Sequence, residues 1–239
     1  MSLVAEHTRW HQQRLDALTA PDGWLTLVNL VWLDDGRQVI GSGPHATIAL
    51  PDGPEVLGQL VVTGGRATWY PAEPAGNPQP LATDRDGSPT VIRSGRSSFF
   101  LIEREQGLGL RLRDEQAATR INFAGIDCFD FDPAWRLRAV WDGHRARFTH
   151  AGTEHSLRPQ EPHAETLQFV LADATSGRET YGGGRFLFVP RPADDDLVLD
   201  FNRATNPPCA FTPFAVCPLP PAENRLPFAV TAGERTYRP

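Results

Sequence analysis

GQLVVTGGRATWY, residues 58–70, is the segment that decides the fold class of this chain. On both sides of Gly64-Gly65 the larger apolar side chains alternate with neighbours of the opposite face, which is typical of a strand with one buried face. Two consecutive glycines adopt the positive φ angles of a two-residue hairpin turn without steric cost. The segment therefore predicts a β-hairpin.

The same period of two recurs along most of the chain after residue 20. It is found in RQVIGSG (37–43), ATIALP (46–51), SSFFLIEREQGLGLRLR (97–113) and WRLRAVWD (135–142), with Gln106-Gly107 as a second hairpin turn. Before it, residues 3–18 predict one amphipathic helix that TAPDG (19–23) ends. Its apolar side chains available for packing are Leu3, Trp10, Leu15 and Leu18.

We therefore predict a mainly β protein in three parts. Residues 1–20 form an N-terminal helix, residues 21–120 a small β sandwich, and residues 121–239 an antiparallel sheet with a long proline-rich loop. We expect the sandwich to pack on the C-terminal sheet, so that the parts make one compact unit. The proline-rich segment PAEPAGNPQP (71–80) is expected to be a surface loop.

Composition limits the classes of function. The 239 residues are 40% hydrophobic and 22% charged, which is ordinary for a soluble domain. The net charge of −6 disfavours nucleic acid as a partner. All 23 basic residues are arginine, which excludes Schiff-base lysine chemistry and the P-loop lysine.

Membrane insertion and export are also not expected. The longest apolar run, Trp24–Leu33, is too short to cross a bilayer as a helix, and the first 15 residues lack the pattern of a signal peptide. The three cysteines form an odd set without a C-x-x-C motif, which favours reduced thiols. We therefore expect a cytoplasmic protein with no cofactor and no bound metal.

Polar side chains gather where the last predicted strand, LVLDFN (197–202), meets the proline-rich segment. Leu197, Leu199 and Phe201 share one face of this strand, so Asp200 and Asn202 share the other. From Arg203 to Leu226 six prolines prevent a strand ladder, which predicts an ordered irregular loop. Such a loop either walls a binding pocket or covers an open edge of the sheet.

We predict that the loop and its neighbours wall one pocket for a carboxylate or phosphate. Its ligand-binding residues are Tyr181, Arg185, Asn202, Arg203, Asn206 and Arg225, together with Cys209. The predicted function is binding of a small anionic ligand or a partner segment. The alternative is a hydrolase or transferase that uses Cys209 as its nucleophile.

Other motifs leave their interpretation open. Cys209 and Cys217 suit packing, a nucleophile, a metal pair or a local disulfide. The glycines of TYGGGRF (180–186) suit either an anion cradle with Arg185 or a bend in a hairpin. His7 and His11 have metal-ligand spacing, although a solvated helix face explains them better.

Long segments resemble a known family. DATSGRETYGGGRFL (173–187), DFNRATNPPCAFTPFAVCPLPPAENRLPFAVTAGE (200–234) and APDGWLTLVNLVWL (20–33) are similar to the domain of unknown function 1684 family of bacteria and archaea. This resemblance implies no known reaction and no established site residues.

A weaker resemblance covers residues 39–70, VIGSGPHATIALPDGPEVLGQLVVTGGRATWY, which resemble the β core of forkhead-associated domains. Ser42 stands where those domains have arginine, and no Ser-x-x-His motif follows Pro51. The resemblance implies a sandwich, and these departures argue against phosphothreonine recognition.

Overall fold

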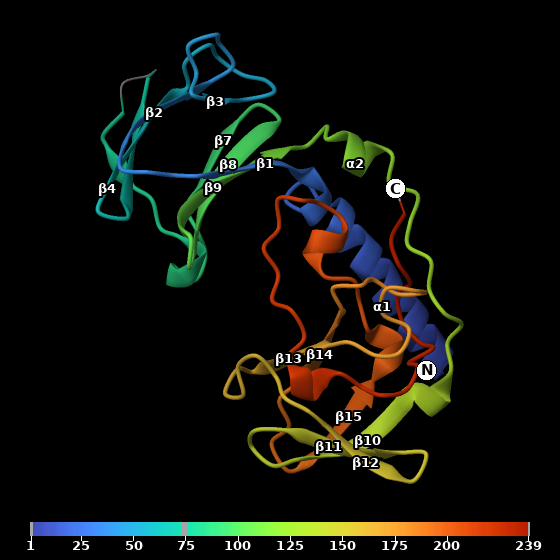
Figure 1. Cartoon of the computed structure of the whole chain (residues 1–239). Coiled ribbons are helices and arrows are strands. Elements are labelled where there is room, and N and C mark those ends of the chain that lie inside the picture. Colours follow the sequence, from blue (N-terminus) through green and yellow to red (C-terminus); the bar gives the residue numbers. More distant parts are fainter. Residues whose placement is uncertain (1, 73–75, 239) are drawn as a thin grey trace. The chain divides into compact units, whose positions relative to one another are not determined.

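The computed structural model describes residues 2–72 and 76–238, which form two compact units. The sandwich unit is Thr19–Phe123, and the C-terminal unit joins Met1–Leu18 to Ala124–Pro239. Most strands pair antiparallel and a helix stands at the N-terminus, so the prediction of a mainly β protein is confirmed (Figure 1). Among the described helices, none has the length and apolar character needed to span a bilayer.

The sandwich unit consists of two sheets that share one core. Its strands are β1 (Leu27–Trp32), β2 (Gly36–Gly41), β3 (Ile48–Ala49), β4 (Gly58–Thr63), β5 (Arg66–Pro71), β6 (Gln79–Pro80), β7 (Val91–Ser94), β8 (Ser97–Arg104) and β9 (Gly107–Asp114). Its short helices are η1 (Trp24–Thr26), η2 (Asp84–Asp86) and α2 (Ala118–Ile121). The sheet orders are β1-β9-β8-β7 and β3-β2-β4-β5-β6. Ile40 and Leu60 of the second sheet pack in one buried cluster with Phe99 and Leu101 of the first.

Both predicted hairpins of this unit are present. β4 and β5 pair from Gly58 to Thr63, and the turn between them has φ of 56° at Gly64 and 74° at Gly65. β8 and β9 pair along their whole length, with φ of 108° at Gly107. The proline-rich segment 71–80 ends in the two-residue strand β6 at the edge of its sheet, and residues 73–75 lie outside the described residues.

The C-terminal unit combines a four-stranded sheet, a two-stranded sheet and helix α1 (Leu3–Thr19). Its strands are β10 (Arg136–Trp141), β11 (Ala146–His150), β12 (Thr153–Leu157), β13 (Thr166–Leu171), β14 (Arg185–Pro190) and β15 (Asp196–Asp200). Its 3-10 helices are η3 (Pro133–Trp135), η4 (Phe201–Arg203), η5 (Pro208–Ala210) and η6 (Ala222–Asn224). The larger sheet has the order β12-β11-β10-β15, and β13 pairs with β14.

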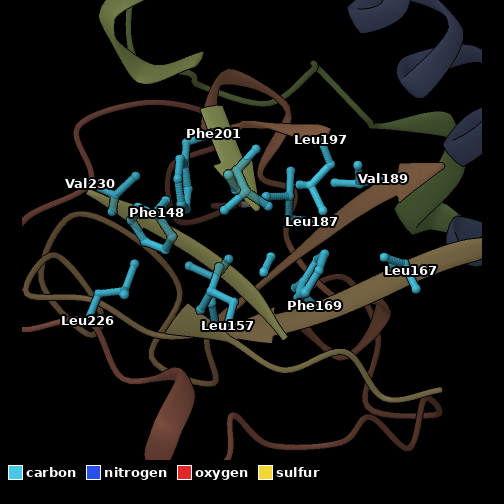
Figure 2. Close-up of a cluster of buried hydrophobic side chains, with 14 of the residues drawn as sticks. Phe148, Leu157, Leu167, Phe169, Leu187, Val189, Leu197, Phe201, Leu226 and Val230 are labelled. Atoms are coloured by element: carbon cyan, nitrogen blue, oxygen red, sulfur yellow. The ribbon is translucent and has the colours of Figure 1, made fainter. Parts of the chain in front are cut away.

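One buried cluster holds this unit together. Figure 2 shows Phe148 and Leu157 from the larger sheet close to Phe169 and Leu187 from the β13-β14 pair, with Phe201 beside them. These five side chains are all nearly inaccessible to water. Fully burying each one is worth roughly 1.5–3 kcal/mol, and the cluster packs the β13-β14 pair against the larger sheet.

Helix α1 begins and ends close to the predicted positions. Leu18 is buried and Trp10 and Leu15 are half-buried, whereas Leu3 is exposed and does not dock. Glu234 receives a hydrogen bond of 2.9 Å from Nε of Arg14, which ties α1 to the C-terminal segment. Helix α1 therefore packs with residues more than 200 positions later in the chain.

The proline-rich segment from Arg203 to Leu226 contains η5 and η6, and its strand contacts are single bridges. Thr205 pairs with Phe186 and Arg225 with Ala172. The segment that precedes β14 also differs from a continuous strand, because TYGGG forms a turn and the strand begins at Arg185. Gly184 has φ of 88° and lies against Pro220, which only a glycine permits.

Candidate functional site

Arg185 lies inside the protein, where it is fully buried. Its Nη2 donates to Asp173 at 2.8 Å and to the carbonyl of Val230 at 3.0 Å, and its Nη1 donates to the carbonyl of Ala232. Burial lowers the pKa of Arg185, and the Asp173 carboxylate opposes this shift. The prediction that Arg185 contacts an anionic ligand is therefore wrong, because protein groups enclose its guanidinium and it anchors the C-terminal segment.

Asn202 is also enclosed. Its Oδ1 accepts a hydrogen bond from the N–H of Asp132 at 3.0 Å, and its Nδ2 donates to the carbonyl of Asp132 at 2.9 Å and to Asp200 at 3.0 Å. These bonds fasten the chain before η3 to the end of β15. Asp132 in turn caps η3 by accepting from the N–H of Ala134, so its carboxylate has a structural contact.

Asn206 joins the proline-rich segment to α1 and to the C-terminal segment. Its N–H donates to Glu234 at 2.6 Å, and its carbonyl accepts from Nη2 of Arg14 at 2.9 Å. Its Nδ2 donates to the carbonyl of Arg235 at 2.7 Å. Because Glu234 is itself fully buried and also accepts from Arg14, this network fixes the guanidinium plane of Arg14.

Arg203 is a predicted residue whose side chain lines a cavity. It is half-buried, its Nη2 donates to Glu6, and its Nε lies 3.5 Å from an oxygen of Asp200. Its guanidinium stands 5.7 Å from the centre of the Trp10 ring. Two carboxylates and an aromatic ring therefore hold Arg203 between α1 and the end of β15.

A cavity of about 270 Å³ opens beside Arg203, between α1 and β14. It is lined by Trp10, Gln13, Arg14, Phe188, Arg203 and Thr205. A smaller cavity of about 110 Å³ shares Phe188 and Arg203 with it and continues to Arg136 and Asp200. These two hollows share lining residues, and we call them together the α1 groove. Phe188 is 49% exposed, which is unusual for a large aromatic residue and leaves its ring available at the groove.

A larger hollow of about 570 Å³ lies over β10 and β11 but offers a poorer site. Its arginines, Arg138 and Arg147, pair with Asp196 and Glu154 at the protein surface. The side chains of Arg138 and Asp196 are 84% and 69% exposed, so water screens both charges. The α1 groove has the better-held guanidinium groups.

Cys209 makes a second group with Tyr181 and Cys217. The N–H of Cys209 donates to Sγ of Cys217 at 3.3 Å, and the Tyr181 hydroxyl donates to the carbonyl of Cys209 at 3.4 Å. Hydrogen bonding from Cys217 lowers the pKa of Cys209 to about 6, with a further contribution from Tyr181. Burial raises the pKa of Tyr181 to about 12. Among the described residues, no histidine or carboxylate hydrogen-bonds to Cys209.

Arg225 is exposed beside the end of β13, where its backbone bridges Ala172. The seven predicted residues therefore fall into separate groups. Arg203 lines the α1 groove, and Asn206 supports it through Arg14. Tyr181 joins Cys209.

His7 and His11 do not form a solvated helix face, since both are half-buried. The ring of His7 lies 5.0 Å from that of Phe131, and His11 lies 4.0 Å from Sγ of Cys128. Burial lowers the pKa of His7. The described residues contain no group of three His, Cys, Asp or Glu side chains placed to hold a metal ion.

The predicted ligand-binding residues did not include Trp10, Gln13, Arg14 and Phe188, which line the groove. A signal for Phe188 exists, because the alternation in RFLFVP places it on the face opposite Leu187 and leaves an aromatic ring outside. The helix residues carry no such signal, since an arginine and a glutamine are ordinary on a helix surface.

Comparisons with known proteins place the C-terminal half in a family. Residues 142–235 match the model of "Protein of unknown function (DUF1684)". An uncharacterized protein of Haloarcula marismortui, solved by solution NMR, is 32% identical. The match covers 49% of this chain and 79% of that chain, with a TM-score of 0.41. Among curated proteins, none matches the chain.

Proposed function

This chain belongs to the DUF1684 family of proteins of unknown function, and we propose from the α1 groove that it binds a small organic anion. The observation that carries the proposal is that Arg14 and Arg203 line one cavity together with Trp10 and Phe188. Guanidinium N–H donors beside two aromatic walls suit a carboxylate on an apolar or aromatic body.

The two groove arginines also have hydrogen-bond donors that their internal contacts do not use. Each guanidinium carries five N–H donors, and the internal contacts of Arg14 use its Nε and Nη2. Arg203 likewise meets Asp200 and Glu6 through Nε and Nη2. Among the described residues, Nη1 of each arginine has no hydrogen-bond acceptor, so it can donate to a ligand carboxylate.

The side chains are held in place before a ligand arrives. Arg14 is fixed by the buried Glu234 and Asn206, and Arg203 is fixed by Asp200 and Trp10. Ordering a long side chain on binding costs about 0.5–1.5 kcal/mol, and this cost is reduced when the protein already orders it. A cavity of about 270 Å³ is at the small end of ligand sites, which typically begin at roughly 300 Å³, so we propose a ligand of metabolite size.

Binding is a better proposal than catalysis at Cys209. A cysteine nucleophile in a hydrolase or transferase works with a base that is oriented toward it, and the described partners of Cys209 are a thiol and a phenol. The groove needs no base. We also propose a cytoplasmic location, which the odd set of cysteines without a C-x-x-C motif favours.

A thermal-shift experiment tests the proposal with matched probes. Benzoate and indole-3-acetate are compared with benzamide and indole-3-acetamide, which keep the rings but lose the charge. At a hundredfold excess over Kd, a carboxylate stabilises the protein by about 2.7 kcal/mol and raises Tm by several degrees. We expect the carboxylates to stabilise and the amides to have little effect.

Three variants locate the site. Arg203→Gln and Trp10→Leu should remove the carboxylate shift, whereas Arg225→Gln removes the same charge from an exposed position and should retain it. The proposal is refuted if neither carboxylate stabilises the wild type, if the amides stabilise equally, or if Arg203→Gln keeps the full shift.

A further inference from the structure

Two cysteines that are eight positions apart lie side by side in the proline-rich segment. The N–H of Cys209 points at Sγ of Cys217 over 3.3 Å, and hydrogen bonding from the Cys217 side chain lowers the pKa of Cys209. We propose that Cys209 and Cys217 are a redox-active pair that small hydroperoxides oxidise to a reversible disulfide. This inference is independent of the α1 groove.

The backbone brings the two residues within disulfide reach. The N–Cα bond is about 1.46 Å long, so Cα of Cys209 lies within about 4.8 Å of Sγ of Cys217. A disulfide joins Cα atoms that are roughly 4.4–6.8 Å apart, and the short contact between the Cys209 N–H and the Cys217 sulfur is compatible with such a span. Pro208 precedes Cys209 and Pro218 follows Cys217, so φ is restricted next to both residues.

The chemistry of the pair distinguishes it from the third cysteine. With a pKa of about 6, Cys209 is mostly thiolate at neutral pH, and the thiolate is the reactive form. Burial, with the carboxylates of Glu234 and Asp127, raises the pKa of Cys128 to about 12. Cys209 and Cys217 are both half-buried, so each keeps some contact with solvent.

The reaction balances as a two-electron oxidation. The Cys209 thiolate attacks an oxygen of the hydroperoxide ROOH, the O–O bond breaks, and Cys209 becomes a sulfenic acid while RO⁻ takes a proton from solvent to give ROH. The sulfur of Cys217 then attacks the sulfur of Cys209, the S–O bond breaks, and the hydroxide leaves with the Cys217 proton as water. Two thiols and one hydroperoxide thus give one disulfide, one alcohol and one water.

Tyr181 has a positioning role in this reaction. Its hydroxyl donates to the backbone carbonyl of Cys209 at 3.4 Å, and hydrogen bonding from Tyr181 contributes to the lowered pKa of the Cys209 thiol. The Tyr181→Phe variant keeps the ring and loses the hydroxyl. We expect it to raise the pH midpoint of thiolate formation, followed by absorbance near 240 nm, and to slow oxidation at pH 6 more than at pH 9.

The test treats the full chain with hydrogen peroxide at pH 7 and counts thiols after unfolding. We expect the loss of two thiols of three, recovery with dithiothreitol, and a non-reduced digest in which the peptides of Cys209 and Cys217 are linked. The oxidation rate should rise through pH 6 and then level off. Oxidation of Cys128 at an equal rate, or disulfides between two chains instead of within one, would overturn the proposal.

Single substitutions separate the two steps. In Cys217→Ser the first step proceeds and the sulfenic acid of Cys209 is trapped by dimedone, whereas Cys209→Ser should not react. Cys128→Ser is the matched control and should form the disulfide at the wild-type rate, so it keeps the proposal testable if another variant fails to fold. Trapping of dimedone on Cys217 in place of Cys209 would contradict the assigned order.

Discussion

Replacing Arg185 by methionine tests whether this residue is a structural anchor. The substitution keeps a long apolar side chain but leaves the Asp173 carboxylate buried without its cation, and the carbonyls of Val230 and Ala232 without their donor. Removing one partner of a buried ion pair costs about 3–5 kcal/mol. Domains of this kind are stable by about 5–15 kcal/mol, so we expect a large fraction of the free energy of unfolding to be lost.

Urea unfolding followed by segment-resolved hydrogen exchange measures this loss. For a loss of about 4 kcal/mol and a slope of roughly 2 kcal/mol/M, the midpoint of the C-terminal unit should fall by about 2 M. The sandwich unit, Thr19–Phe123, contains neither Arg185 nor its partners and serves as an internal reference. Its midpoint should not change.

Two further variants separate charge from packing. Arg225→Met makes the same substitution at an exposed position and should change stability by no more than about 0.5 kcal/mol. Asp173→Asn added to Arg185→Met removes the uncompensated charge and should recover part of the loss. If Arg185→Met is as stable as Arg225→Met, the anchoring role assigned to Arg185 is wrong.

Three other expectations follow from single positions. Gly184→Ala should destabilise by about 1–3 kcal/mol more than Gly152→Ala in urea unfolding. Both glycines have positive φ, but an added Cβ at Gly184 meets a carbonyl oxygen at 2.6 Å and a proline ring, whereas Gly152 has open space. Equal losses of stability would contradict this clash. The carboxyl of Asp142 should titrate by NMR with a pKa of about 2, because backbone N–H groups, first that of His144, and a guanidinium stabilise its charge. Its contribution to stability is therefore present above pH 3.8 and lost as pH falls through about 2. A titration midpoint near pH 3.8 would show that these hydrogen bonds do not persist. Phe201→Ala should cost about 3–5 kcal/mol in the same unfolding assay, because Phe201 is fully buried in the core of Figure 2, and a loss below about 1 kcal/mol would show that this core rearranges.

Part of the candidate site could be expected from the order of residues alone. The predicted strand 197–202 ends at Asp200 and continues as η4, but Asp200 and Asn202 do lie together, joined by a hydrogen bond of 3.0 Å, and Arg203 does line a cavity. The sequence could not show that Arg185 is buried, because an arginine is usually exposed and nothing local indicates that Asp173 faces it. The prediction for Arg185 was wrong for a physical reason: the charge that suits an anionic ligand also suits an internal carboxylate.

The groove itself depends on contacts that are distant in the chain. Arg14 and the carbonyl of Asn206 are 192 positions apart, and Arg14 and Glu234 are 220 positions apart. Trp10 meets Arg203 only because α1 belongs to the C-terminal unit. A helix surface with mixed polar and aromatic residues does not specify which of two β units it joins.

By itself, the sequence determined the features that depend on neighbours in the chain. Alternation with a period of two defines the strands, and paired glycines with positive φ define the hairpin turn at Gly64-Gly65, because both are set by local backbone sterics and by which side chains share a face. Only the tertiary structure decided that β15 pairs with β10, that Asp173 neutralises Arg185, and that α1 closes the groove over β14. These features depend on burial, and burial is a property of the folded chain that a charged or aromatic residue does not carry in its local sequence.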